Sequence, residues 1–171
     1  MAAEILVLRL VHVVGGIFWV GSGLFTTFFL VPSLAAAGPA AGQLMGGLQR
    51  RHLFTVLPLV ALLTILSGVR LMMITSAGFS PAYFQSDAGR GFAWGGTFAI
   101  AGFVLSLLVV RPAAVRSGAL AAQLAQATDD AARADLSGKL ARLRRRGAAS
   151  GLVATSLLLL AAGLMAVARY L

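Results

Sequence analysis

The hydrophobic positions of this chain gather into four long runs separated by polar or charged connections. The runs cover about residues 5–31, 53–75, 92–110 and 148–168. A helix needs about 20 mostly apolar residues to cross a bilayer, because the hydrocarbon core is about 30 Å thick and each residue adds about 1.5 Å. None of the runs shows the alternation that a lipid-facing β-strand requires. The pattern predicts an all-α integral membrane protein with four spans.

Composition excludes the main classes of soluble protein. Hydrophobic residues make up 59% of the 171-residue chain, charged residues make up 11%, and the mean hydropathy is +0.91. Soluble domains carry about 25% charged residues, so a soluble enzyme and a disordered chain are both excluded. The chain has no cysteine, which excludes disulfides, iron–sulfur clusters and thiolate zinc sites. Residues 1–171 are therefore expected to form one membrane domain.

The positive charges are distributed unevenly between the two sides that four spans define. The connections 32–52 and 111–147 carry Arg50, Arg51, Arg111, Arg116, Arg133, Lys139, Arg142, Arg144, Arg145 and Arg146, whereas the opposite side has only Arg9, Arg70, Arg90 and Arg169. Cytoplasmic loops carry the excess of Lys and Arg. We therefore expect a bacterial inner-membrane protein with both termini periplasmic and both basic connections cytoplasmic. The net charge of +9 then needs no nucleic-acid partner, since the basic run also lacks interleaved aromatic residues.

The connection 112–146 has the pattern of two helices. Strong helix formers follow Pro112, which marks a kink or a restart of the helix. Residues 128–130, Thr-Asp-Asp, resemble an N-cap with first-turn acids, and an apolar stripe then follows at Leu136, Leu140 and Leu143. The preferred interpretation is an antiparallel cytoplasmic hairpin that extends spans three and four, with the leucines of its arms facing each other. The alternative is a pair of amphipathic helices lying on the anionic inner leaflet.

Small residues recur in the spans at a spacing that lets helices approach closely. The pairs are Gly91 and Gly95, Gly102 and Ser106, Gly147 and Gly151, and Ala162 and Ala166. Helix association in lipid depends on close van der Waals contact, which small residues permit. The pattern predicts a compact four-helix bundle that associates with other membrane subunits or with itself.

The first span carries the most informative polar residue. His12, Gly16, Trp19, Gly23 and Thr26 share one helical face. In one interpretation, His12 hydrogen-bonds to another helix while Trp19 packs in the core. In another, His12 is an axial ligand of a haem b, and a metal-ion or quinone contact is a third option.

The haem interpretation would involve further residues of the periplasmic half. Met72, Met73 or Met165 would supply the sixth ligand, and Arg9 and Arg70 would lie near the propionates, with Trp19 beside the ring. His52 lies at the cytoplasmic start of span two, too deep to share an iron with His12, and is expected to be an interfacial side chain.

Proline 58 lies six residues inside the second span. Its ring removes one backbone donor, so the carbonyl of Phe54 should be free for another partner.

The opening of the first span has a recognisable pattern. Residues 8–12 read LRLVH and residues 16–21 read GIFWVG. This pattern resembles the copper-resistance D-type membrane domain and the membrane-embedded N-terminal domain of bacterial urate oxidases, and more loosely the membrane-type protoporphyrinogen oxidases. It is most similar to small, uncharacterised four-span bacterial membrane proteins with the same opening. The resemblance implies a helical bundle in which His12 binds haem or a metal. It implies no catalytic activity, because span three lacks the intramembrane lysine of the protoporphyrinogen oxidases.

Three functions remain open, in a definite order. The chain shows no nucleophile–base pair, paired carboxylates, P-loop or dinucleotide fingerprint, so we expect no enzyme. The first expectation is a non-enzymatic accessory or structural subunit of a respiratory or photosynthetic membrane complex. The second is a haem b-binding protein in electron transfer or haem handling. The third is a small transporter, for which the spans offer few polar side chains.

Overall fold

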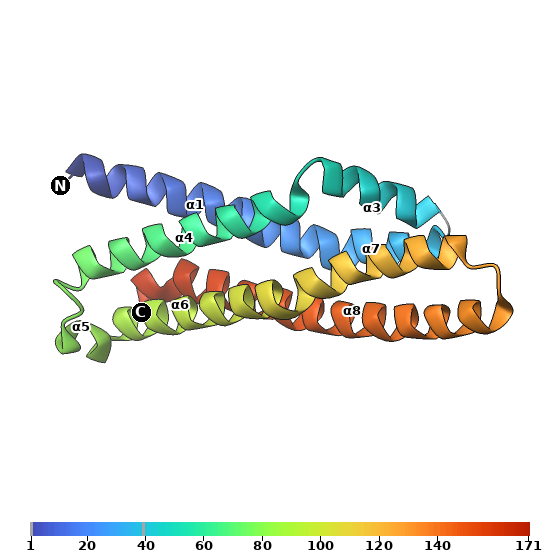
Figure 1. Ribbon diagram of the computed structural model, residues 1–171. Helices are drawn as coiled ribbons and strands as arrows, with labels where there is room; N and C mark the ends of the chain where they lie inside the picture. The colour runs from blue at the N-terminus through green and yellow to red at the C-terminus, as the bar shows by residue number, and fades with distance from the viewer. Residues whose placement is uncertain (1, 39) are drawn as a thin grey trace.

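The structure is a computed structural model that describes residues 2–38 and 40–171, so Met1 and Pro39 lie outside the described residues. All regular structure in this part of the chain is helical (Figure 1). Four of the helices are long and apolar enough to cross a membrane, at Ala2–Ala36, Leu53–Thr75, Asp87–Gln126 and Asp130–Tyr170. The predictions of an all-α chain and of four candidate spans are therefore confirmed.

The two halves of the chain each contribute two long helices. In the first half, α1 (Ala2–Phe25) continues into α2 (Val31–Ala36), and α3 (Ala40–Arg50) leads to α4 (Leu53–Thr75). In the second half, the short α5 (Pro81–Gln85) precedes α6 (Asp87–Leu105), which continues into α7 (Arg111–Gln126), and α8 (Asp130–Val167) ends in a 3₁₀ turn at Ala168–Tyr170. The predicted first and third spans are thus parts of longer helices. A 40-residue helix is about 60 Å long, about twice the thickness of the hydrocarbon core.

Two π-helical turns carry these long helices past a proline. One covers Thr26–Leu30, just before Pro32, and the other covers Ser106–Val110, just before Pro112. The backbone N–H groups of Val31 and Arg111 donate to carbonyls five residues back, which is the wider π pattern. The wider turn accommodates a ring that would otherwise clash with the preceding turn. The chain therefore stays helical from α6 through Pro112 into α7, and α7 begins at Arg111 directly after the π turn.

Helix α3 forms where the sequence predicts only a connection. It covers most of the segment between the first and second spans and contacts α4 and α7. It ends at Arg50, and His52 then adopts a left-handed backbone conformation with φ of 57° before α4 begins. Both Arg50 and His52 are exposed.

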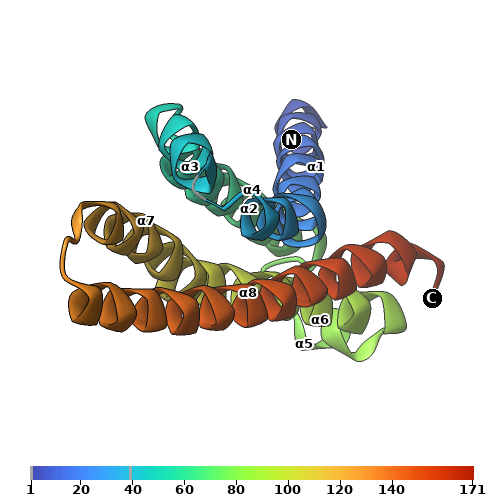
Figure 2. The same ribbon diagram turned by 90° about the vertical axis from the view of Figure 1, so that its right-hand side faces the viewer.

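The long helices pack mainly as two pairs, α1 with α4 and α6 with α8 (Figures 1 and 2). Glycines of α6 make its contact with α8 close: a Cβ atom at Gly95 would lie 3.2 Å from the carbonyl oxygen of Ala161, and one at Gly102 would lie 3.2 Å from that of Ala154. Of the predicted pairs, Gly91 and Gly95 both lie in close contacts and so does Gly102, whereas an added Cβ at Gly151 would meet no heavy atom within 4 Å. Ala162 and Ala166, in contrast, are exposed.

The buried core lies where all four long helices come together. Trp19 of α1 packs with Ala61 of α4 and Leu158 of α8, and its ring meets the ring of Phe103 of α6 edge to face with centroids 6.1 Å apart. Edge-to-face aromatic pairs add to the contact energy of a packed core. Trp19 therefore connects the α1–α4 pair to the α6–α8 pair.

Helix α7 and the first half of α8 form an antiparallel hairpin (Figure 2). Asp129 caps α8, because its carboxylate accepts a hydrogen bond from the Ala132 N–H at 2.8 Å. The cap is thus one residue later than the predicted Thr128, and Asp130 is the one acidic residue of the first turn. Leu140 is buried and Leu143 is half-buried against α7. The leucine stripe of the second arm thus faces the first arm, as predicted.

The carbonyl that Pro58 leaves without a helical donor has a partner from another helix. Arg111, at the start of α7, donates from Nε to the carbonyl oxygen of Phe54 at 3.0 Å. The predicted availability of this carbonyl is confirmed, and the bond connects the start of α4 to the junction of α6 and α7.

This bond gives a testable double-mutant cycle. We expect Arg111→Ala to lower the free energy of unfolding by about 1 kcal/mol, because the Phe54 carbonyl loses its donor. In a Pro58→Ala background the new N–H of residue 58 supplies a helical donor, so the cost of Arg111→Ala should fall to less than half. The measurement is SDS-induced unfolding in mixed micelles, followed by circular dichroism. Arg116→Ala, at an exposed position of the same helix, is the control, and equal costs of Arg111→Ala in both backgrounds would refute the coupling.

Candidate functional site

The candidate site is centred on His12, which faces α4 from the first half of α1. Its Nδ1 lies 2.8 Å from the carbonyl oxygen of Thr64. A carbonyl oxygen can only accept, so Nδ1 carries the proton and donates. In the neutral ring Nε2 then holds the lone pair. The hydrogen bond fixes both the orientation of the ring and its tautomer.

Glycines make room for the polar side chains between α1 and α4. A Cβ atom at Gly68 would lie 2.6 Å from Cε1 of His12, and a Cβ atom at Gly15 would overlap with Oγ1 of Thr64. Each helix therefore places a glycine opposite a polar side chain of the other. Gly68 was missed by the sequence reasoning, although Thr64, Ser67 and Gly68 lie three and four residues apart and so share one face of α4.

Several other polar side chains within the long helices are also hydrogen-bonded. Thr64 donates to the Val60 carbonyl at 2.8 Å, and Ser67 donates to the Leu63 carbonyl at 2.7 Å. The hydroxyls of Thr27 and Thr155 lie 2.8 Å apart and connect the π turn Thr26–Leu30 to α8. In the part of the chain that the structure describes, no buried side-chain nitrogen or oxygen lacks a hydrogen-bond partner. The Thr64 and Ser67 hydroxyls are thus satisfied within α4, whereas the Thr27–Thr155 bond joins two helices.

The predicted face of α1 points inward along its length. Gly16 lies next to the methyl group of Thr64, Trp19 is buried in the core, and Gly23 lies next to Thr155 and Leu158 of α8. The interpretation that His12 bonds to another helix while Trp19 packs in the core therefore describes the observed contacts.

The two arginines proposed for propionates lie in different environments. Arg70 is bound to Glu4, with Nη2 at 2.6 Å and Nε at 3.0 Å from Oε1, and both side chains are partly exposed. Arg9 is exposed. An ion pair at this level connects the first turns of α1 to the far end of α4, so Arg70 already has a structural role.

The methionines proposed as sixth ligands lie against glycines of α6. A Cβ atom at Gly96 would lie 3.9 Å from the methyl group of Met72, and one at Gly95 would lie 2.9 Å from Cγ of Met165. Both side chains thus fill space beside small residues, a common use of methionine. Met73 is exposed.

The arrangement offers one aligned imidazole nitrogen, Nε2 of His12, as a potential ligand atom. Among residues 2–38 and 40–171, no three histidine, aspartate or glutamate side chains gather closely enough to hold a metal ion. Any cofactor held here would depend on a single histidine of this chain, together with a second ligand from a methionine or from another chain.

Comparison with known proteins found no relative of this chain. No protein-family model matches the chain, and no curated protein or solved structure matches it.

Proposed function

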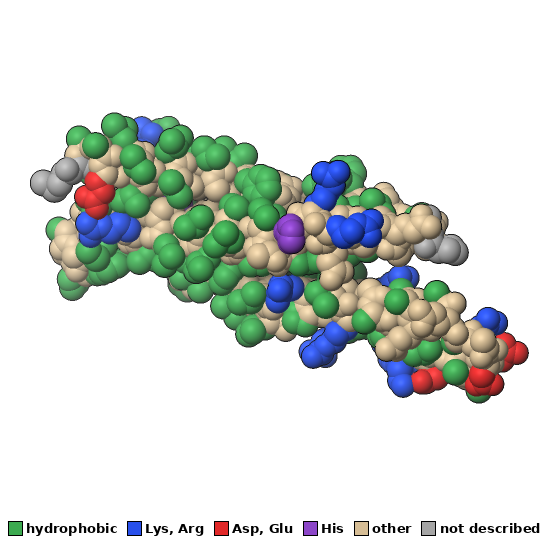
Figure 3. Space-filling view, turned by 45° about the horizontal axis from the view of Figure 1, so that its top comes forward, with side chains coloured by type: hydrophobic (Ala, Val, Ile, Leu, Met, Phe, Trp, Pro, Cys, Tyr) green, Lys and Arg blue, Asp and Glu red, His purple; other side chains and the backbone are tan. Residues whose placement is uncertain are grey.

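We propose that the chain is an inner-membrane four-helix bundle that crosses the bilayer four times, with its termini periplasmic and its hairpin cytoplasmic. The four apolar helices support insertion, and the ten basic residues on the side of α3, α7 and the start of α8 support the orientation. On the face that Figure 3 shows, most of the visible Lys and Arg side chains lie over one half of the molecule, and hydrophobic side chains cover most of the other half.

Within this membrane, we propose that the chain acts as a non-enzymatic accessory or structural subunit. The carrying observation is an apolar hollow of about 300 Å³ on the outer side of the α1–α4 pair. Its walls include Val14 and Phe18 of α1 and Val56 and Leu63 of α4, and Gly15 lies between them. Apolar walls around a glycine suit the close van der Waals packing on which helix association in lipid depends. The hollow therefore fits a side-chain ridge from a helix of another membrane subunit.

The contrast with the inner side of the same helix pair supports this assignment. His12, Thr64 and Ser67 direct their hydrogen bonds to carbonyls of α4. The outer side offers contact through shape and apolar area. The polar groups of this helix pair thus make internal hydrogen bonds, and its outward surface offers an apolar hollow. Such a surface is suited to contact with another membrane subunit.

The test is purification in a gentle detergent, with the complex size read on a native gel and its subunits identified by mass spectrometry. We expect wild type to migrate as a complex with co-purifying membrane proteins or as a homo-oligomer. Val14→Trp fills the hollow and should therefore dissociate the complex. Val13→Trp makes the same change at an exposed neighbouring position that does not border the hollow, and it should leave the complex intact. A stable monomer in gentle extracts would contradict the proposal.

The second candidate is haem b binding, which the tautomer of His12 favours. A histidine that donates from Nδ1 to a backbone carbonyl presents Nε2 as a ligand, the arrangement common among metal-binding histidines. A bound haem would supply one-electron redox chemistry. His12 would hold the iron of this haem. Met72 or Met165, which lie against glycines of α6, would be the candidate second ligand. Arg70 would have to break its ion pair with Glu4 to reach a propionate.

Absorption spectroscopy tests this candidate. If His12 holds haem, protein expressed with ample haem has a Soret band that His12→Ala removes. His52→Ala should leave the band unchanged, because His52 is exposed at the start of α4. A wild-type spectrum without a Soret band would eliminate the haem assignment and leave the subunit proposal intact.

A further inference from the structure

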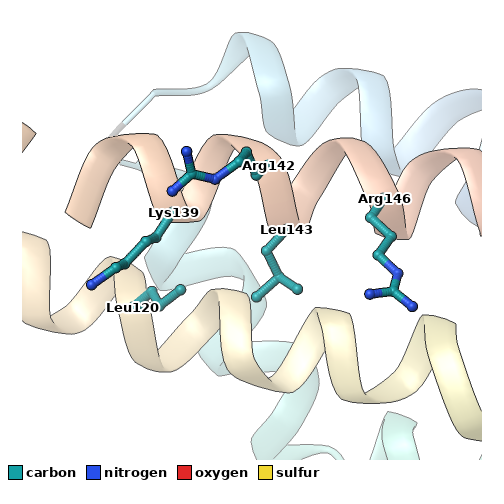
Figure 4. Close-up of a pocket in the computed structure, with 5 residues that line it drawn as sticks. All are labelled: Leu120, Lys139, Arg142, Leu143 and Arg146. Atoms are coloured by element: carbon teal, nitrogen blue, oxygen red, sulfur yellow. The ribbon is translucent and has the colours of Figure 1, made fainter. Parts of the chain in front are cut away.

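A second hollow lies between the arms of the hairpin, and its chemistry differs from that of the α1–α4 hollow. It has a volume of about 340 Å³ and is bordered by Leu120 of α7 and by Lys139, Arg142, Leu143 and Arg146 of α8. Figure 4 shows Leu143 directed toward α7 between the arms, with Arg146 reaching toward α7 on one side and Lys139 reaching past Leu120 on the other. The hollow combines an apolar floor with a cationic rim.

The acidic residues of the chain pair with only one of the three basic residues of this rim. Glu4, Asp87 and Asp130 pair with Arg70, Arg90 and Arg133, and Asp129 caps α8. The fifth acidic residue, Asp135, binds Lys139 at 2.7 Å. Among the described residues, no carboxylate therefore pairs with Arg142 or Arg146, and these two guanidinium groups define the charge of the hollow.

The hollow lies close to the point where α8 becomes apolar. Arg146 directly precedes the apolar run 148–168, and Lys139 lies seven residues earlier, about 10 Å along the helix. The headgroup layer on each side of a bilayer is about 5–8 Å thick. With the membrane orientation proposed above, Arg146 and Arg142 lie at the level of the cytoplasmic headgroups.

We infer that this hollow binds the phosphate headgroup of an anionic membrane lipid. Guanidinium groups bind phosphate through paired, charge-assisted hydrogen bonds, and two of them one turn apart suit a headgroup with two phosphates. The leucines accept the apolar part of the lipid next to its headgroup, which a free phosphate ion does not have. Basic pockets on the cytoplasmic side of membrane helices are typical places for such lipids. This inference rests on the proposed membrane orientation and is independent of which subunits bind the chain.

The experiment uses the purified full-length chain in nanodiscs, without other subunits. Native mass spectrometry measures the lipid retained from zwitterionic phosphatidylcholine discs and from discs that also contain cardiolipin or phosphatidylglycerol. We expect retention of the anionic lipids. The double variant R142Q/R146Q should weaken retention at least about tenfold, because it removes the charge-assisted hydrogen bonds that the two guanidinium groups donate to the phosphate.

The matched control is R144Q/R145Q, which removes the same charge from exposed neighbours that do not border the hollow. It should keep most of the affinity, and both variants should retain the wild-type circular dichroism spectrum. Equal losses in the two variants would overturn the inference in favour of diffuse electrostatic attraction. Binding of inorganic phosphate alone as tightly as the anionic lipid would also overturn it, since the leucines would then contribute nothing to binding. A separate result, loss of partner subunits in gentle extracts, would bear only on the proposed function.

Discussion

Gly95→Leu is expected to force α6 away from α8 and to lower the free energy of unfolding by about 3 kcal/mol. A Cβ atom at this position already comes within 3.2 Å of the Ala161 carbonyl oxygen and 2.9 Å of Cγ of Met165. The methionine can move, but the carbonyl belongs to the α8 backbone, so the remaining leucine atoms have no space unless the helices separate. SDS-induced unfolding in mixed micelles measures the effect, with circular dichroism as the signal.

Gly163→Leu is the control for this substitution. It lies in the apolar part of α8, the partner helix of α6, and is exposed, with no heavy atom from elsewhere within 4 Å of an added Cβ. Leucine is a better helix former than glycine, so this variant should be as stable as wild type or more stable. If Gly95→Leu were as well tolerated as Gly163→Leu, the close contact between α6 and α8 would be refuted.

Trp19→Ala is expected to cost about 3 kcal/mol, because it removes the side chain that joins the two helix pairs. Trp19 is 8% exposed and contacts residues of the other three long helices. Truncation leaves a cavity and removes the edge-to-face contact with Phe103. The loss is mainly one of packing, since lipid tails are as apolar as the protein core. Trp19→Phe should recover part of the stability by refilling the cavity.

The second tryptophan of the chain is the control. Trp94 lies on α6, is 58% exposed and contacts Phe98 of its own helix. Trp94→Ala should therefore change the unfolding free energy by less than about 1 kcal/mol. Circular dichroism is the appropriate signal for both variants, because either substitution alters tryptophan fluorescence. Equal effects of Trp19→Ala and Trp94→Ala would show that Trp19 does not hold the core together.

Local features of the fold could be predicted because they depend on neighbouring residues. The apolar runs predicted the long helices, the Thr-Asp-Asp segment at 128–130 predicted the start of α8 to within one residue, and Pro58 predicted a free carbonyl at Phe54. Each of these follows from helix length, capping or the missing proline N–H. The donor to Phe54 was not predictable, because nothing near Arg111 in the sequence indicates which distant carbonyl its side chain reaches.

The candidate site was predictable on one side only. The sequence predicted His12 as a polar residue within a candidate span, but its partner is the backbone carbonyl of Thr64, and a carbonyl carries no residue-specific signal. Gly68 is needed because the imidazole lies against α4, which depends on how α1 and α4 pair. The spacing of small residues also cannot show which helices pair. It predicted the glycines of α6 that contact α8, but it equally predicted close contacts at Ala162 and Ala166, which are exposed.

The central claim is that the chain crosses the membrane with its basic hairpin in the cytoplasm. The absence of cysteine from the sequence allows a direct test with single cysteines. Ala82→Cys, on the exposed surface of α5, should react with a membrane-impermeant maleimide in intact spheroplasts. Thr128→Cys, exposed between α7 and α8, should react only after the membrane is broken. Labelling of Thr128→Cys in intact spheroplasts would contradict the orientation, and with it the assignment of the hairpin hollow to the cytoplasmic leaflet.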